Sequence, residues 1–465
     1  MTVSARPSAT RILVAFAILV TLAACGESAE PSTTTADKST TTTSTIVVAT
    51  TVTAAAQEPD VQAEIDWFVS VLNGEELSED EYRARFTEEF RQQVPFDEGM
   101  QPVLDEFRPA GPYTVVERTG DGIQGEAVVE SADGTQARVL AELDDQSRFN
   151  GLVIQPANPP TLDDPPDSVS EAFGRLSEIG AARALTAEVV DGACVPIEEM
   201  SSAEPAPLGS VIKLYVLAAL GEAVQSGEIA WDDEIVIREE LKSIPTGVLQ
   251  DRPAGDVVTV LETAELMISI SDNTATDHLI DLIGRENVES VMADYGHTSP
   301  ELNTPLMNTR EFTALKVGPA SGLSIQWLEG DEAQRRAILT QISDITPEDL
   351  PIQEWIAPID PDRLEWFASP EDLCNLGVRL SELAGSVPEI GAILEINPGV
   401  PAETGTWDSI WFKGGSEPGL LAAWWLTRSG DRTFVTAGSV VDPSAVIDSD
   451  EAVLLLAAAR DLLAP

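Results

Sequence analysis

Apolar residues recur first at helical spacing and then at strand spacing over residues 59–155. Positions three or four apart predict a helix over Val61–Leu72. A second helix is predicted to start after its N-cap Ser78 and to carry its apolar face on to Val94. Four strand-like runs follow, with turn signals between the first three: Tyr113–Arg118, Ile123–Ser131, Gln136–Leu143 and Phe149–Gln155. We therefore expect a small α+β domain in this part of the chain.

A second patterned region, over residues 165–465, follows a stiff proline-rich linker at residues 156–167. It opens with a helix whose capping box is Ser168–Glu171. It closes with a helix over Asp450–Leu463, which Ser449 is expected to cap. Strands are predicted near both ends of the region: Ala184–Val190, Val195–Met200, Trp407–Phe412, Leu420–Thr427 and Thr433–Val440. The middle is largely helical, so this region is also predicted to be an α+β domain.

The N-terminus has the pattern of an export signal. Two arginines precede the apolar run Ile12–Ala24, which is too short to span a bilayer as a helix. The run ends in Leu22-Ala23-Ala24-Cys25-Gly26, which resembles the bacterial lipobox. The resemblance implies a signal peptide over residues 1–24 and a diacylated Cys25 that anchors the protein to the outer face of the cell membrane. The alternative is an ordinary signal peptide with an incidental cysteine. The lipidated, Thr-rich segment over residues 25–58 is expected to be a disordered stalk.

Charge and histidine content exclude several classes of function. The chain has 79 acidic and 27 basic residues, a net charge of −52, and this field repels the phosphates of nucleic acids. The charge is spread along the chain, which indicates a solubility property rather than a site. There are only two histidines, His278 and His297, which argues against a His-rich zinc site and against a Ser-His-Asp triad. We expect no metal and no nucleic-acid partner.

Two of only five lysines lie in motifs that indicate chemistry. Ser210-Val211-Ile212-Lys213 opens a predicted helix and puts the Lys213 amine on the same face as the Ser210 hydroxyl, one turn later. The helix dipole favours negative charge at Ser210 and disfavours positive charge on Lys213. Ser210 is therefore the candidate acylating nucleophile. The alternative is a solvated serine and lysine on a surface helix.

Two further motifs follow along the chain, Ser271-Asp272-Asn273 and Lys413-Gly414-Gly415. The first is also a plain N-cap that opens a helix, with Asp272 in a structural role. Lys413 is predicted to come directly after an apolar strand, where its amine can neutralise a substrate carboxylate. Without the other motifs, a solvated lysine at a strand end would explain Lys413 equally well.

Together and in this order, the three motifs resemble those of class A serine β-lactamases and of the wider penicillin-recognising serine hydrolases. The layout is similar to that of actinobacterial β-lactamase-like lipoproteins. The resemblance implies that residues 165–465 form a β-lactamase/transpeptidase-like catalytic domain with an antiparallel sheet flanked by helices. Residues 59–155 resemble a nuclear-transport-factor-like or cystatin-like accessory domain. No cofactor is implied.

The same resemblance implies a role for each site residue. Ser271 would relay a proton to the leaving nitrogen, and Asn273 would bind both Lys213 and the amide of the substrate. Lys413 would neutralise the substrate carboxylate and tune Ser271. Substrate would also contact Gly415 and Ser416, and the backbone N–H groups of Ser210 and Ser416 would form the oxyanion hole.

Two departures from the family pattern put substrate and turnover in doubt. Gly414 replaces the Thr or Ser that contacts the carboxylate. Ser299, in Ser299-Pro300-Glu301-Leu302-Asn303, stands where the family has its deacylating glutamate. An insertion is expected over residues 305–360. The deacylating base would be Glu301, Glu354 or Glu365, or it is missing and hydrolysis is slow.

Three functions therefore stay open: a β-lactamase-like hydrolase, a peptidoglycan D-Ala peptidase or esterase with the same site, and a non-catalytic envelope-binding protein. Intact Ser210, Lys213, Ser271 and Asn273 favour the first two. The partner would be a β-lactam, another acyl compound or a peptidoglycan peptide, besides the membrane. Two cysteines outside the signal, Cys194 and Cys374, could form a disulfide or remain two buried thiols.

Overall fold

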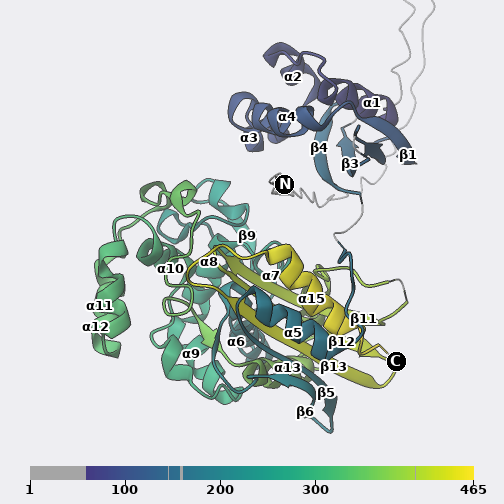
Figure 1. The fold of residues 1–465 in the computed structure, drawn as a ribbon. Coiled ribbons are helices and arrows are strands. Elements are labelled where there is room, and N and C mark those ends of the chain that lie inside the picture. The colour runs from purple at the N-terminus through teal and green to yellow at the C-terminus, as the bar shows by residue number, and fades with distance from the viewer. Residues whose placement is uncertain (1–58, 133, 145, 158–160, 404, 465) are drawn as a thin grey trace, which may run out of the picture. The chain divides into compact units, whose positions relative to one another are not determined.

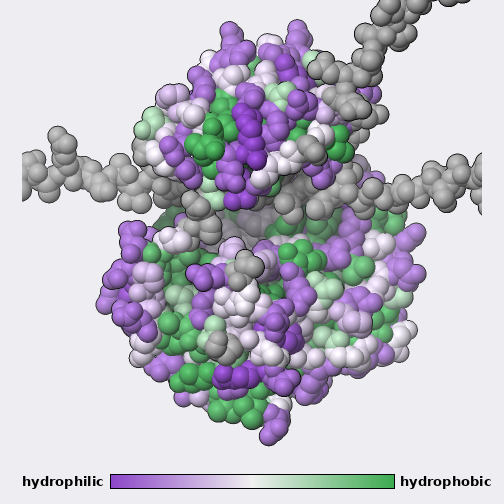
Figure 2. Space-filling model, turned by 90° about the vertical axis from the view of Figure 1, so that its right-hand side faces the viewer, coloured by the Kyte–Doolittle hydropathy of each residue, from purple (hydrophilic) through white to green (hydrophobic). Residues whose placement is uncertain are grey.

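The computed structural model describes residues 59–132, 134–144, 146–157, 161–403 and 405–464. The predicted signal peptide, Cys25 and the stalk lie outside these residues. The chain divides into two compact units, at residues 159 and 160. Of the helices that the structure describes, none combines the length and the apolar character needed to cross a bilayer. Figure 2 shows hydrophilic residues spread over the visible face of each unit, as a distributed charge requires.

The first unit packs short helices against a four-stranded antiparallel meander in the order β1-β2-β3-β4 (Figure 1). Its helices are α1 (Val61–Leu72), α2 (Glu79–Arg85), α3 (Glu88–Gln93) and α4 (Gln101–Phe107). Its strands are β1 (Thr114–Asp121), β2 (Gln124–Glu130), β3 (Gln136–Leu143) and β4 (Phe149–Pro156). The core is aromatic: Phe86 stacks on Phe149, with ring centroids 4.8 Å apart, and Phe68 is also fully buried. The α+β class is confirmed, whereas the nuclear-transport-factor-like or cystatin-like identity stays a prediction.

The prediction of one helix from Ser78 to Val94 is wrong. Ser78 does cap α2, but that helix ends at Arg85, and Phe86 adopts an extended backbone that bridges to Phe149. The Thr87 hydroxyl then accepts a hydrogen bond from the Phe90 amide and starts α3 as a new helix. An N-cap within the apolar run therefore divides into two helices the segment that periodicity alone predicts as one.

The second unit is built on one five-stranded antiparallel sheet in the order β11-β12-β13-β5-β6. Its strands are β5 (Ala181–Val190), β6 (Ala193–Met200), β11 (Ser409–Glu417), β12 (Leu420–Ser429) and β13 (Arg432–Val441). Helices α5 (Val169–Ile179) and α15 (Ser449–Asp461) cover one face (Figure 1). Helix α13 (Pro370–Ala384) packs on the other. Strand β12 is buried on both faces: Trp424 points to the helical middle and Trp425 to α5 and α15.

The remaining helices form the middle of the domain: α6 (Lys213–Ser226), α7 (Val260–Ser269), α8 (Asn273–Ile283), α9 (Arg285–Asp294), α10 (Thr309–Lys316), α11 (Ser324–Glu329), α12 (Glu332–Gln341) and α14 (Glu389–Glu395). Short two-stranded ladders join β7 (Ala206–Pro207) to β10 (Phe367–Ala368) and β8 (Glu234–Val236) to β9 (Val257–Thr259). Strands from both ends of the domain around a helical middle confirm the predicted β-lactamase-like architecture.

Three boundary predictions are corrected. Strand β11 continues to Glu417, so Lys413 lies within a strand and not after it. Asp448, not Ser449, caps α15, because its carboxylate accepts from the Glu451 amide. At the start of α5 the Glu171 carboxylate accepts from the Asp167 amide, so the expected capping box is not formed, although Ser168 is the N-cap.

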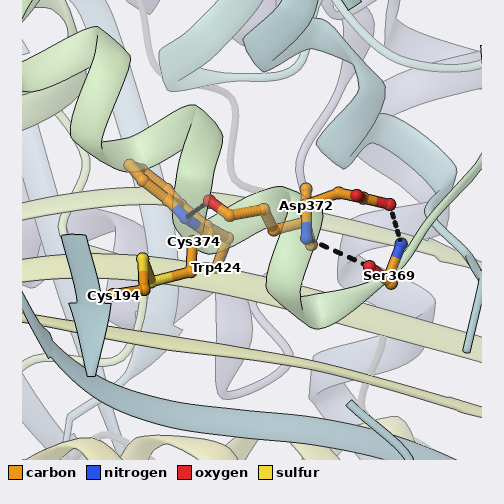
Figure 3. Close-up of a disulfide and its surroundings, with 6 residues drawn as sticks. Cys194, Ser369, Asp372, Cys374 and Trp424 are labelled. Carbon is orange, nitrogen blue, oxygen red and sulfur yellow. Dashed lines mark hydrogen bonds between the residues drawn. A yellow bond between two sulfur atoms is a disulfide. The ribbon is translucent and has the colours of Figure 1, made fainter. Parts of the chain in front are cut away.

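The two cysteines form a disulfide, which settles the alternative that the sequence left open. It joins the edge strand β6 through Cys194 to the buried Cys374 of α13 (Figure 3). The same helix is tied to the sheet by Trp424, whose indole N–H donates to the Leu373 carbonyl at 3.1 Å. The bridge therefore links the far edge of the sheet to the helical middle across 180 residues of sequence.

Candidate active site

The candidate nucleophile lies on a tight turn between β7 and α6. Residues Gly209–Ile212 form a 3₁₀ turn that continues into α6, and Ser210 is half-buried there. Gly209 has φ +50°, and a Cβ placed on it would lie 3.0 Å from the amide nitrogen of Ser416. Only glycine allows this left-handed backbone to approach β11 so closely without strain. The turn thus sets Ser210 beside the strand that carries the Lys413 motif.

Lys213 occupies the first turn of α6 with no exposed surface. Its Nζ donates to Asn273 Oδ1 at 2.7 Å, to the Ser271 carbonyl at 2.6 Å and to Ser271 Oγ at 3.0 Å. Burial lowers the pKa of Lys213 from 10.5 to about 7, against the opposing charges of Asp272 and Asp277. A substantial share of this amine is therefore neutral near pH 7 and able to accept a proton.

Ser271 is held in the left-handed region, at φ +61°, which is uncommon for a residue with a side chain. Its carbonyl accepts from Thr246 Oγ1 at 2.7 Å as well as from Lys213. The next residue, Asp272, caps α8 and also accepts from the amides of Val248 and Leu249 at 2.7 and 2.9 Å. These bonds hold a strained backbone in place, as is typical of functional sites.

Lys413 reaches the same hydroxyl from the opposite side. Its Nζ lies 3.0 Å from Ser271 Oγ and 2.9 Å from the Gly414 carbonyl, and the side chain is 3% exposed. Burial and the positive charge of Lys213 both lower its pKa well below the ordinary value. Ser271 Oγ is therefore in contact with two amines, which is the arrangement a proton relay needs. The structure thus brings together Lys213, Ser271, Asn273 and Lys413, although Lys213 Nζ makes no hydrogen bond to Ser210 within the described residues.

At Gly415, strand β11 lies directly against the nucleophile turn. A Cβ placed on it would lie 2.3 Å from the Leu208 carbonyl oxygen and 2.4 Å from the Ser210 amide nitrogen. Ser416 follows and is exposed, with its amide next to Gly209. The two amides expected to form the oxyanion hole, those of Ser210 and Ser416, therefore border the same contact between turn and strand.

We predict that Gly415→Ala lowers acylation of Ser210 at least ~100-fold, because the methyl group would push β11, which carries the Ser416 amide, away from the Ser210 amide. The matched control is Gly414→Ala, whose methyl group would meet the Phe412 ring at 2.9 Å, since the three nearest atoms all belong to that ring and none to the nucleophile turn. Labelling rates of both variants with a fluorescent penicillin measure the effect. Equal rates for the two variants would contradict the prediction.

The glycine that departs from the family pattern has a local explanation. Phe412 and Gly414 lie on the same face of β11, and the Phe412 ring covers the place where a side chain at 414 would begin. The ring is held by Trp425, with centroids 4.9 Å apart, and by Gly399. The hydroxyl that the family places here is thus replaced by packed aromatic surface, which the sequence motif alone did not indicate.

The three candidates for a deacylating base are in different environments. Glu301 and Glu354 are exposed, and Glu301 borders a surface hollow of about 440 Å³. Glu365 is 3% exposed, and its Oε2 accepts from the amides of Gly209 at 2.9 Å and Trp366 at 3.2 Å. Ser299 is half-buried, and its amide donates to His297 Nδ1 at 3.0 Å. Only Glu365 of these carboxylates touches the nucleophile turn.

The segment expected to be an insertion folds into α10, α11, α12 and short turns, which lie to one side of the domain in Figure 1. Its ends are joined, because the Asn303 amide group exchanges hydrogen bonds of 2.7 and 2.8 Å with the Phe367 backbone. Helix α10 is docked on α8 by Asp277, whose carboxylate accepts from the amide and hydroxyl of Thr309 at 2.7 Å. Burial raises the pKa of Asp277 to about 6.

Sequence reasoning missed a third buried lysine near this site. Lys316, at the end of α10, pairs with Glu417 Oε1 at 2.5 Å, four residues beyond Lys413. The sequence does distinguish Lys316, since it is one of only five lysines. Its contact was unpredictable, because the insertion that carries it has no pattern that places it in space.

Comparison with protein families gives two matches. Residues 197–346 match the model of the β-lactamase enzyme family, and residues 56–149 match the model described as the N-terminal part of the ORF 12 gene product. The first match covers the Ser210 and Ser271 motifs, and the second covers the first unit without its last strand. Comparison with curated proteins gave no match.

Several solved structures are similar to the second domain. A β-lactamase from Sphaerobacter thermophilus is 22% identical, with a TM-score of 0.46, over 64% of this chain and 98% of that chain. A variant of PBP-A, solved as an acyl-enzyme complex with penicillin G, is 19% identical, with a TM-score of 0.43, over 64% of this chain and 97% of that one. A β-lactamase from Xanthomonas campestris pv. campestris is 17% identical, with a TM-score of 0.43, over 63% and 97%.

Proposed function

Because its second domain is a β-lactamase-like serine hydrolase domain, we propose that this protein is acylated at Ser210 by a β-lactam or a related acyl substrate and then hydrolyses the acyl-enzyme slowly. The observation that carries the proposal is the contact of Ser271 Oγ with both Lys213 Nζ and Lys413 Nζ at 3.0 Å. A structural role alone gives no reason to bury two lysines around one hydroxyl.

In the proposed acylation, Ser210 Oγ attacks the carbonyl carbon of the substrate and its proton passes to the neutral Lys213 amine. Lys213 returns this proton through Ser271 to the leaving nitrogen as the carbon–nitrogen bond breaks. The amides of Ser210 and Ser416 stabilise the oxyanion, and Lys413 pairs with the substrate carboxylate. The proton taken from the serine thus ends on the leaving group, and the site returns to its starting charge.

Slow deacylation follows from the environment of the candidate bases. Hydrolysis needs a carboxylate that can reach a water molecule next to the acylated serine. Position 299 has a hydroxyl instead, Glu301 and Glu354 are exposed, and Glu365 Oε2 is occupied by two backbone amides. We therefore expect the acyl-enzyme to accumulate.

An esterase or D-Ala peptidase with the same site is the second candidate, and Gly414 favours the esterase, because a D-Ala peptide ends in a carboxylate. Without the hydroxyl at this position, and with Phe412 packed beside it, binding of a substrate carboxylate rests on Lys413 alone. A substrate without that carboxylate, such as a simple ester, loses less binding energy when glycine replaces the hydroxyl residue at position 414.

We also propose that the protein is exported and lipid-anchored at Cys25. The Cys194–Cys374 disulfide supports export, since disulfides persist in oxidising compartments. Globomycin-sensitive processing of the full chain in a bacterial host, compared with Cys25→Ser, tests the anchor. Membrane release of the variant and retention of the parent chain are the expected results.

The test of the proposed function is intact-mass spectrometry after incubation with a fluorescent penicillin. The parent protein is expected to gain one stable acyl group, and Ser210→Ala none. Turnover without an adduct would mean efficient deacylation. If the parent protein shows neither an adduct nor turnover, but hydrolyses a p-nitrophenyl ester that Ser210→Ala does not hydrolyse, the esterase is favoured. Absence of the adduct, of turnover and of ester hydrolysis would leave a non-catalytic binding protein.

A further inference from the structure

Glu365 is a buried carboxylate that holds the backbone of the nucleophile turn. Its Oε2 accepts from the Gly209 amide at 2.9 Å, one residue before Ser210. Its Oε1 is buried without a hydrogen-bond partner among the described residues. A buried ionised carboxylate is stable only when both oxygens are paired, so this environment favours a protonated Glu365.

A second carboxylate and a lysine lie where β11 meets the same turn, because Gly209 approaches the Ser416 amide and Glu417 follows Ser416 on the strand. Glu417, at the end of β11, has its side chain 4% exposed and pairs with Lys316 Nζ, which has no exposed surface. Glu417 Oε2 is also buried without a partner in the described part of the chain. The Nζ of Lys316 lies 5.0 Å from the centre of the Phe312 ring and 5.7 Å from that of Trp355, so two aromatic faces add to its pairing with Glu417.

The three groups hold more negative than positive charge unless one proton is bound. The charges that act on Glu365 come from Glu417 on β11, which raises its pKa, and from Lys316 on α10, which lowers it. Burial is the largest cause and, with Glu417, raises the pKa of Glu365 to about 8. Burial raises the pKa of Glu417 to about 7, against the charge of Lys316. Burial thus favours the protonated form of both carboxyls, and the charge of Glu417 favours it further at Glu365.

We propose that Glu365, Glu417 and Lys316 form a proton-dependent clamp that holds the nucleophile turn against β11. A protonated carboxyl can bridge the two glutamates while Glu365 still accepts from Gly209. Loss of the proton sets two negative charges against each other, one on the turn and one on the strand. The turn and β11 then separate, and the amides of Ser210 and Ser416 no longer converge. Glu365 is thus a positioning residue, and α10 of the insertion controls the site through Lys316.

The inference rests on the proposed acylation of Ser210 and predicts the alkaline side of its pH profile. The rate constant for labelling with a fluorescent penicillin is measured from pH 5 to 9. The rate constant of the parent protein should increase towards pH 7 as Lys213 becomes neutral, and it should then decrease at least ~3-fold above pH 8. Glu365→Gln keeps the shape and the acceptor for Gly209 but cannot ionise, so its rate should stay on the plateau.

Two further variants and a control sharpen the test. Glu417→Gln should also remove the alkaline fall, and Lys316→Met should move it by about one pH unit to higher pH, because the proton is then held more tightly. The control Glu222→Gln removes a half-buried carboxylate that accepts from Tyr295 OH at 2.6 Å, outside the site, and should keep the parent profile. An alkaline fall that persists unchanged in Glu365→Gln would overturn the clamp.

Hydrogen exchange separates failure of the clamp from failure of the proposed function. If the parent protein is not acylated at any pH, the function fails, and exchange in the peptide over residues 206–212 still tests the clamp. After correction for intrinsic rates, exchange should increase from pH 7 to 9 in the parent protein but not in Glu365→Gln. Equal exchange in the two proteins would contradict the clamp.

Discussion

Lys213→Met is expected to lower the rate of Ser210 acylation by about 10²–10⁴-fold, the range that a positioned proton acceptor contributes. In the proposed acylation, Lys213 Nζ takes the proton of Ser210 and passes it to Ser271, which lies 3.0 Å away, and methionine has a similar length but no proton-accepting atom. The measurement is the labelling rate at pH 7.5. The matched control is Lys242→Met, which removes a lysine paired with Glu239 outside the site and should label at the parent rate.

The same variant is expected to change the dependence of stability on pH. The pKa of Lys213 falls from 10.5 in the unfolded chain to about 7 in the folded protein, so the unfolded chain binds more protons between these values. Stability of the parent protein therefore rises with pH over this window, and the full cost of the buried ammonium is present below pH 7. The melting temperature of Lys213→Met, relative to the parent, should be highest at pH 6 and should decrease towards pH 9. A pH-independent difference would show that Lys213 is not titrating.

Removing the Cys194–Cys374 disulfide is expected to lower the free energy of unfolding by about 5 kcal/mol, because the bridge closes a loop of 180 residues. For a domain of this size such a loss lowers the melting temperature by roughly 10 °C. The double variant Cys194→Ala/Cys374→Ala tests this by thermal unfolding. Labelling of Ser210 at 25 °C should be unchanged, since the bridge joins β6 to α13 and none of its atoms contacts the site.

A reductant provides the control for the disulfide. Reduction should lower the melting temperature of the parent protein to that of the double variant and leave the double variant unchanged. If the double variant has the same melting temperature as the parent protein, the denatured chain is already constrained in this region. The loop-closure argument then fails for this protein.

Local rules predicted the elements better than their ends. The helix over Val61–Leu72 and the strand Gln136–Leu143 follow directly from residue spacing. The split at Phe86 did not, because Thr87 is a cap only when the chain ahead of it is extended by pairing with Phe149. Strand β11 was cut short at Phe412 for a related reason: glycines lower strand propensity, yet Gly415 is required here by the close approach of Leu208 and Ser210.

The motifs made Ser210, Lys213, Ser271, Asn273 and Lys413 predictable as a set, and the structure brings the last four into one hydrogen-bonded group. Their contacts depend on residue types at fixed places on a few elements, which a sequence can record. The role of Glu365 was not predictable in this way. It was one of three equal candidates, and only burial against Gly209 distinguishes it from Glu301 and Glu354.

The sequence by itself determined the two α+β regions, the order of the motifs and the chemistry they bring, because these depend on local spacing and on residue type. Only the tertiary structure decided that Cys194 and Cys374 pair, that Phe412 covers Gly414, and that Lys316 meets Glu417 beside the nucleophile turn. The first and the third join residues far apart in the chain, and the second depends on Trp425 and Gly399, which pack against the Phe412 ring. Such contacts are fixed by how the elements pack against one another, and no local sequence pattern encodes that packing.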